Sequence, residues 1–168
     1  MTDFKQAFIK GQNAVHQAHA AKAEIRDIFA RLARDVSEIT DGIVRVEVEE
    51  LVQSQYSTGI GSIAFAAAKL LAESQRLPTE LWITARNSAL PNNRPTKLAL
   101  VDETETGYPI SIRYGKNDER CHDKVGLEQA LASFLAAPSI GERLLAVKDQ
   151  SMKQGKQIPN PDPSTSQP

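Results

Sequence analysis

Apolar residues recur at alternating steps of four and three along the first forty residues of the chain, and no proline interrupts them. Only Gly11 and Lys22 lack an apolar side chain in this series. Such steps are typical of the seam of an α-helix. We therefore predict a coiled-coil-like helix over residues 3–40, with Asp3 as its N-terminal cap and Gly42 just beyond its end. The series comprises Phe4, Phe8, Gly11, Val15, Ala18, Lys22, Ile25, Phe29, Leu32, Val36 and Ile39.

A helix of this length is longer than the domain to which it belongs. It would extend about 55 Å at 1.5 Å per residue, whereas a compact chain of this size has a radius of gyration of about 15 Å. The seam is bulky over residues 25–39 and mostly small or polar over residues 11–22. We expect the second half to anchor the core. The first half is expected to contact another protein or a second copy of the chain, with Val15 and Ala18 in the contact.

Strand patterns occupy the middle of the chain. Val44, Val46 and Val48 alternate with charged residues over positions 43–52, which is the pattern of a half-buried strand. Three more short apolar stretches predict strands, and the last two are close enough to form a hairpin. These strands are predicted over residues 81–85, 98–101 and 108–114.

Three further helices are indicated by apolar residues at helical spacing, each after a residue that can cap a helix. They are predicted over residues 62–77, 123–137 and 139–149. Together the elements predict an α+β fold with a long N-terminal helix, a mostly antiparallel sheet of about four strands, and helices packed on one face. We expect a single domain over residues 1–149 and a disordered tail over residues 150–168, where apolar residues are scarce.

The predicted core combines the second half of the long helix with the inward face of the sheet and the C-terminal helices. Alternation along strands and three-to-four spacing along helices select its members. The largest of them are Ile25, Phe29, Leu32, Val36, Val46, Ile83, Leu100, Ile112, Leu131 and Leu144.

Composition narrows the class of protein. The 168 residues are 40% hydrophobic and carry a formal net charge of −1, which argues against a surface that is basic throughout and made for nucleic acid. No segment has the apolar length of a membrane span or the pattern of a signal peptide. We therefore expect a cytoplasmic protein that does not use a membrane, a cofactor or a metal ion.

An acidic strand is the first candidate for recognition. Glu47, Glu49 and Glu50 lie within the predicted strand 43–52, where Arg45 is the one basic residue. Further acidic residues occur at the predicted hairpin turn, 102–107. If these two places lie together, they form a surface suited to a basic partner; the alternative is a solvated strand face without a partner.

A second candidate is a stretch rich in arginine and asparagine over residues 86–97. These residue types bind phosphates and the edges of bases, so the stretch supports an alternative function as a nucleic-acid-associated protein. The ordinary alternative is a solvated connection between strands. Its candidate residues are Arg86, Asn92, Asn93, Arg94 and Lys97.

Candidates for catalysis are weaker. Cys121, His122 and Asp123 are adjacent in sequence, and neighbouring side chains do not readily form a triad in space; we expect a loop followed by a helix cap. The loop 57–62 precedes a predicted helix and could bind an anion, which would suit a small enzyme with a phosphate-binding loop, but it lacks the lysine of a P-loop.

The leading prediction of function is a non-enzymatic protein–protein interaction protein. A subunit, an adaptor or a toxin-neutralising partner of the immunity kind would each fit the overlong helix and the acidic strand. Nucleic-acid association and a small phosphate-binding enzyme remain the alternatives.

Overall fold

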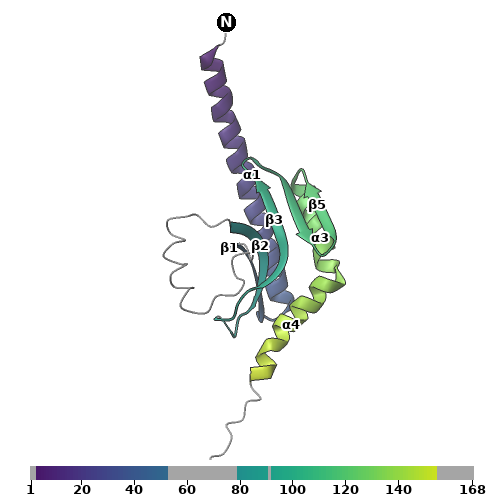
Figure 1. Cartoon of the computed structure of the whole chain (residues 1–168). Helices are drawn as coiled ribbons and strands as arrows, with labels where there is room; N and C mark the ends of the chain where they lie inside the picture. The colour runs from purple at the N-terminus through teal and green to yellow at the C-terminus, as the bar shows by residue number, and fades with distance from the viewer. Residues whose placement is uncertain (1–2, 53–78, 91, 155–168) are drawn as a thin grey trace, which may run out of the picture.

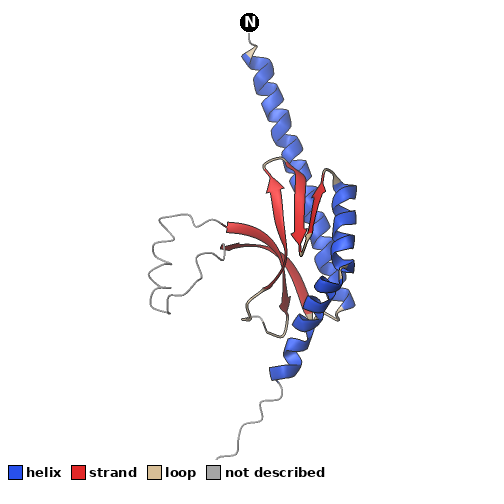
Figure 2. Ribbon diagram, turned by 45° about the vertical axis from the view of Figure 1, so that its right-hand side comes forward, coloured by secondary structure: helices blue, strands red, loops and turns tan. Residues whose placement is uncertain are grey.

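The computed structural model describes residues 3–52, 79–90 and 92–154, and these form a sheet covered by helices (Figures 1 and 2). The predicted helix 62–77, the loop 57–62 and residues 155–168 of the predicted tail lie outside the described residues. The described elements, in chain order, are α1 (Phe4–Ile39), β1 (Val44–Val52), β2 (Thr79–Asn87), β3 (Thr96–Thr104), β4 (Gly107–Tyr114), β5 (Asn117–Cys121), α3 (Lys124–Ala136) and α4 (Pro138–Gln154).

The sheet is an antiparallel meander whose five strands lie in sequence order, β1-β2-β3-β4-β5. Helix α1 contacts β1 and β4, α3 contacts β4 and β5, and α4 contacts β1, β2 and β3. The three helices lie on one side of the sheet in Figure 2. The prediction of an α+β fold with a long N-terminal helix and a largely antiparallel sheet is therefore confirmed.

Helix α1 begins and ends where the sequence predicts. The Asp3 carboxylate accepts hydrogen bonds from the backbone N–H groups of Lys5 and Gln6, at 3.0 and 3.3 Å, which satisfies donors that the first turn leaves free. At the other end Gly42 has a φ of +75°, and its N–H donates to the Ser37 carbonyl at 2.8 Å. A left-handed glycine after the last turn is a common helix terminator.

The core lies between the second half of α1, the inner face of the sheet and helices α3 and α4. Seven of the ten residues predicted for it are buried; Phe29, Leu100 and Leu144 are half-buried. Leu100 is paired with Trp82, whereas the neighbouring Val101, on the inner face, is buried. The Leu100 side chain therefore points to the outer face, because successive strand residues alternate between faces. The seven buried residues are Ile25, Leu32, Val36, Val46, Ile83, Ile112 and Leu131.

A fifth strand, β5, corrects the prediction of about four strands. It follows β4 through the two residues Gly115 and Lys116, since Tyr114 is paired with Asn117. Four of its five residues are polar, so it lacks the apolar alternation by which the other strands were found. The one sequence signal was Gly115, whose φ of +57° suits a two-residue hairpin turn.

The C-terminal helix also runs further than predicted. Helix α4 begins at Pro138 and continues to Gln154, into the segment 150–168 that was predicted as a disordered tail. The buried Asn87 side chain fastens it to the sheet by donating to the carbonyl groups of Val147 and Lys148, at 2.9 and 3.3 Å. The low hydrophobicity of the sequence near residue 150 could not reveal this anchoring, because the anchoring comes from hydrogen bonds between residues 60 and 61 positions apart.

Candidate partner-binding surfaces

The first half of α1 projects beyond the sheet and the other helices (Figure 1). Every residue from 3 to 17 is exposed. Three of its apolar side chains are among the most exposed in the described part of the chain: Phe4 at 81%, Phe8 at 66% and Val15 at 55%. Ala18, the other residue predicted for a contact, is half-buried. We call residues 4–20 the projection.

The projection starts where the β3–β4 hairpin meets α1. A Cβ atom at Gly107 would lie 3.0 Å from the Ala21 Cβ and 3.3 Å from the Lys22 backbone nitrogen, so only glycine permits this close approach. The neighbouring Tyr108 hydroxyl donates to the Glu24 carboxylate at 3.0 Å. Burial and that carboxylate together raise the pKa of Tyr108. The hairpin thus holds α1 from Ala21 onward.

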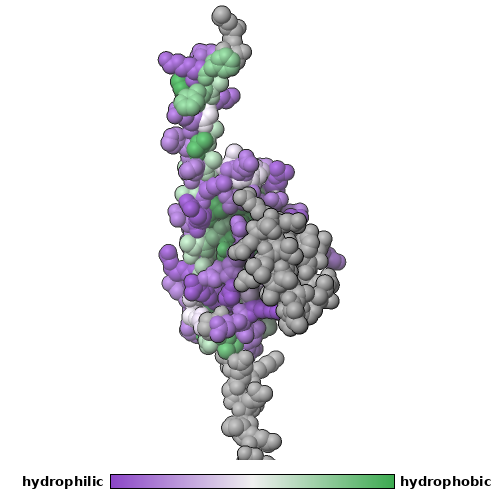
Figure 3. Space-filling view, turned by 60° about the vertical axis from the view of Figure 1, so that its left-hand side comes forward, coloured by the Kyte–Doolittle hydropathy of each residue, from purple (hydrophilic) through white to green (hydrophobic). Residues whose placement is uncertain are grey.

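A half-open apolar groove lies beside the anchored part of α1. Its volume is about 650 Å³. One wall is the side of α1 that carries Phe29, Ala30 and Ala33, and the other is the inner face of the sheet at Val48 and Leu81. Figure 3 shows green apolar residues both along the projection and in the middle of the molecule on the same face. Three acidic residues also line the groove: Glu47, Glu49 and Glu103.

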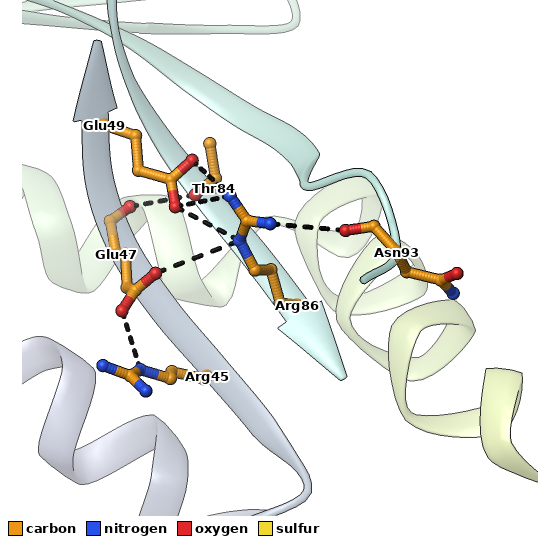
Figure 4. A network of polar contacts seen from close by, with 6 residues as sticks. All are labelled: Arg45, Glu47, Glu49, Thr84, Arg86 and Asn93. Carbon is orange, nitrogen blue, oxygen red and sulfur yellow. Dashed lines mark hydrogen bonds and ion pairs between the residues drawn. The ribbon is translucent and has the colours of Figure 1, made fainter. Parts of the chain in front are cut away.

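Glu47 and Glu49 of the predicted acidic strand are engaged in ion pairs with arginines of the same sheet (Figure 4). The Arg86 guanidinium donates to both oxygens of the Glu49 carboxylate at 2.9 Å. Glu47 is 2.7 Å from Arg45 and 4.0 Å from Arg86. These arginines neutralise much of the charge that a basic partner would meet at the two glutamates.

Glu50 lies elsewhere and joins the acidic hairpin. It lines a hollow of about 550 Å³ in which acidic side chains outnumber the basic Lys22 and Arg113. The sequence raised the possibility that the strand and the hairpin turn share an acidic surface. Of the three strand glutamates, Glu50 is the one that lines the same hollow as the acidic residues of the hairpin. The acidic residues of the hollow are Glu50, Glu80, Asp102, Glu103 and Glu105.

The residues of the Arg/Asn-rich stretch are spread over two strands and the connection between them. Arg86 belongs to β2 and is bound to Glu49, and it also donates to the Asn93 carbonyl at 3.3 Å. Lys97 belongs to β3, and its ammonium lies 4.6 Å from the centre of the Trp82 ring. The Asn93 amide donates to Gln150 of α4 at 3.3 Å. Asn92 and Arg94 are exposed.

Cys121 occupies the end of β5 and is 3% exposed, which corrects the prediction that it lies in a solvent-accessible loop. Burial, and then the carboxylates of Glu119 and Asp123, raise the pKa of its thiol. A thiol held protonated is a poor nucleophile. Asp123 accepts a hydrogen bond from the Gly126 N–H at 2.8 Å and caps α3 as predicted, and His122 is exposed.

Neither a metal cluster nor a single membrane-spanning helix is found among residues 3–52, 79–90 and 92–154. No group of three histidine, cysteine or acidic side chains there could hold a metal ion. Helices α3 and α4 together have the length and composition of a broken span, with a bend of 66° between them. Their apolar residues Leu127, Phe134 and Ile140 are buried within the protein.

Comparisons with protein families, with curated proteins and with solved structures find no match to this chain. The candidate surfaces therefore stand on their own geometry. The sequence pointed to the projection through the length of the seam. It did not point to the groove, because the groove depends on how far β1 and β2 stand away from α1 near Phe29 and Leu81.

Proposed function

We propose that the protein is a non-enzymatic protein–protein interaction protein whose partner binds along the projection. One observation carries the proposal. On the N-terminal side of Ala21, the amphipathic helix α1 extends for about four and a half turns with large apolar side chains exposed. A helix of this length has little stability of its own in water. Packing of its apolar stripe against a partner would supply the missing stabilisation, because burial of apolar surface is favourable.

The stripe has the composition of a helix that packs closely against another helix. Its bulky members, Phe4, Phe8 and Val15, are separated by Gly11 and Ala18. Small residues let two helix backbones approach, and large ones fill the space between them. The opposite side of the projection carries Lys, Gln, Asn and His residues and one large apolar residue, Ile9, which is 47% exposed. It is mostly polar, as expected for the solvent side of an amphipathic helix.

The acidic hollow supports the further proposal that the same partner has a basic segment. Among the strand glutamates it is Glu50 that adds to the hairpin carboxylates there, whereas Glu47 and Glu49 are paired with arginines. A basic segment of the partner would be attracted to this hollow, and the attraction would weaken as salt rises. Nucleic-acid association has less support, since Arg86 and Lys97 are occupied by Glu49 and Trp82.

Affinity capture with the full chain tests the proposal. The wild-type protein is compared with Phe8→Glu, which places a charge in the apolar stripe, and with Ala20→Glu, which adds the same charge on the opposite side of α1. We expect Phe8→Glu to lose the bound protein and Ala20→Glu to retain it. Equal capture by all three proteins, with unchanged circular dichroism, would refute a role for the projection.

A further inference from the structure

The exposed stripe of the projection and the apolar groove face the same side of α1. Val15 and Ala33 are 18 residues apart, as are Gly11 and Phe29, and 18 residues make five turns of 3.6. Each pair therefore points in one direction. Phe29 and Ala33 line the groove, while Gly11 and Val15 lie on the projection. Among the described residues, one side of the helix is thus incompletely covered in both halves: Phe29 and Ala33 are half-buried beside the groove, and the projection is exposed.

We propose that the occupant of this groove is the projection of a second copy of the chain, with the two α1 helices antiparallel about a two-fold axis near Ala18. The inference rests on the proposed function and names its partner. About this axis the projection of each copy lies on the groove of the other. The arrangement is closed, and it produces two identical contacts instead of an open chain of molecules.

The antiparallel register matches small residues with large ones. A two-fold axis between Ala18 and His19 pairs each residue with the one that brings the two numbers to a sum of 37, so Phe8 lies opposite Phe29 of the partner and Gly11 opposite Arg26. Phe29 is half-buried and can accept an aromatic neighbour, and Gly11 has no atom within 4 Å of a Cβ built on it. Ridges of one helix can therefore enter the spaces of the other.

Charge also favours this occupant. The projection carries Lys5 and Lys10 and no acidic residue; the nearest acid, Asp3, is its N-terminal cap. Among the described residues, three glutamates line the groove, but Glu47 and Glu49 are paired with Arg45 and Arg86, which leaves Glu103 as the acidic group available to the projection. Glu103 lines both the groove and the acidic hollow, and no ion pair or side-chain hydrogen bond engages it among the described residues. In this register Lys10 comes opposite Asp27 of the partner, beside the turn of α1 from Ile25 to Phe29 that lines the groove together with Glu103.

Sedimentation equilibrium of the full-length protein is the first arm of the test. The wild type is expected to be a concentration-dependent dimer with twice the 18.4 kDa mass of the chain, and Phe8→Glu to be monomeric. Ala30→Glu, which alters only the groove wall, should also be monomeric, while Ala20→Glu remains dimeric. A wild type that is monomeric up to high micromolar concentration would overturn the self-association but not the proposed function, which the capture experiment decides separately.

A charge exchange is the second arm. Lys10→Glu and Glu103→Lys should each raise the dimer dissociation constant about tenfold or more, because each brings like charges together. The double variant Lys10→Glu/Glu103→Lys should recover most of the loss. Additive losses without recovery would show that these two residues are not neighbours across the interface, and would overturn the register.

Disulfide cross-linking determines the orientation and is the third arm. In a Cys121→Ser background, Ala18→Cys should form a covalent dimer, since the axis brings the two copies of residue 18 within the roughly 7 Å that a disulfide requires. Gly11→Cys should not, because its two copies lie on opposite sides of the axis. Efficient cross-linking at both positions would indicate a parallel pair, which leaves the grooves empty and overturns the proposal.

Discussion

Arg86 organises the outer face of the sheet near β1. It is 29% exposed in its side chain, it donates to both oxygens of Glu49, and it reaches the Asn93 carbonyl of the following connection. Beside it, the Thr84 hydroxyl donates to the Glu47 carbonyl at 3.3 Å and is fully buried. A bidentate guanidinium–carboxylate pair in a partly buried position restricts both side chains to one arrangement. The contact fastens β1, an edge strand, to β2.

Replacing Arg86 by alanine should therefore reduce the free energy of unfolding by roughly 1.5–3 kcal/mol, because a charged hydrogen-bond partner is lost and Glu49 is left half-buried. Arg45→Ala is the matched control: Arg45 is 70% exposed and contacts Glu47 through one nitrogen, so its loss should cost less than about 0.5 kcal/mol. Urea denaturation measures both. Equal effects would mean that the Arg86 network contributes no more than an ordinary surface pair.

Cys121 gives a prediction about reactivity and pH. Its thiol is 3% exposed and its pKa is raised by burial and neighbouring carboxylates, so a thiol reagent at pH 8 should modify the folded protein much more slowly than the urea-unfolded chain. The raised pKa has a consequence for stability. Below the pKa of the thiol in the unfolded chain, the raised pKa of the folded thiol has no effect on stability. As pH rises above that value, the unfolded chain loses its thiol proton first and the free energy of unfolding falls. Equal rates of modification in the two states would contradict the burial.

At the scale of elements, the contact between the β3–β4 hairpin and α1 fixes where the domain ends and the projection begins. Gly107 has a φ of +90° and lies against Ala21, so it satisfies two requirements at once: a left-handed turn and a close approach to the helix. Tyr108, the next residue, adds a hydrogen bond to Glu24.

Gly107→Ala should accordingly destabilise the protein more than Gly115→Ala. Both glycines have positive φ, and each substitution should cost roughly 1 kcal/mol or more in backbone strain. Only at Gly107 would the new methyl group also meet backbone and Cβ atoms of α1, since nothing lies within 4 Å at Gly115. Thermal unfolding of the two variants compares them directly. Equal losses would show that the hairpin does not press on α1.

Most of the elements could be predicted because their signals are local. The seam of α1, its Asp3 cap and the alternation of Val44, Val46 and Val48 each depend on residues close in sequence. The polar strand β5 could not be found in this way. The ion pair between Glu49 and Arg86 could not be predicted either, because the two residues are 37 positions apart. The sequence of each segment alone does not determine the β1–β2 register that brings them together, so they were interpreted as two separate binding surfaces.

At the scale of the whole molecule, the burial of α1 divides at Ala21. Its buried residues, Ile25, Ile28, Leu32 and Val36, are part of the core, whereas the large apolar residues from Phe4 to Val15 are exposed. The overhang was predictable from helix length alone, and its exposed side is where the proposed function places the partner. The groove that faces the same side required the arrangement of α1, β1 and β2 in space.

Site-specific photo-crosslinking in cells tests the role of the projection most directly. A benzophenone amino acid is placed at position 8, within the apolar stripe, or at position 20, on the opposite side of α1, in the otherwise unchanged chain. We predict a strong adduct from position 8, with a second copy of the chain or with another protein, and little from position 20. Adding Val15→Glu should abolish the adduct. No adduct at position 8, or equal adducts at both positions, would contradict the claim that the projection binds a partner.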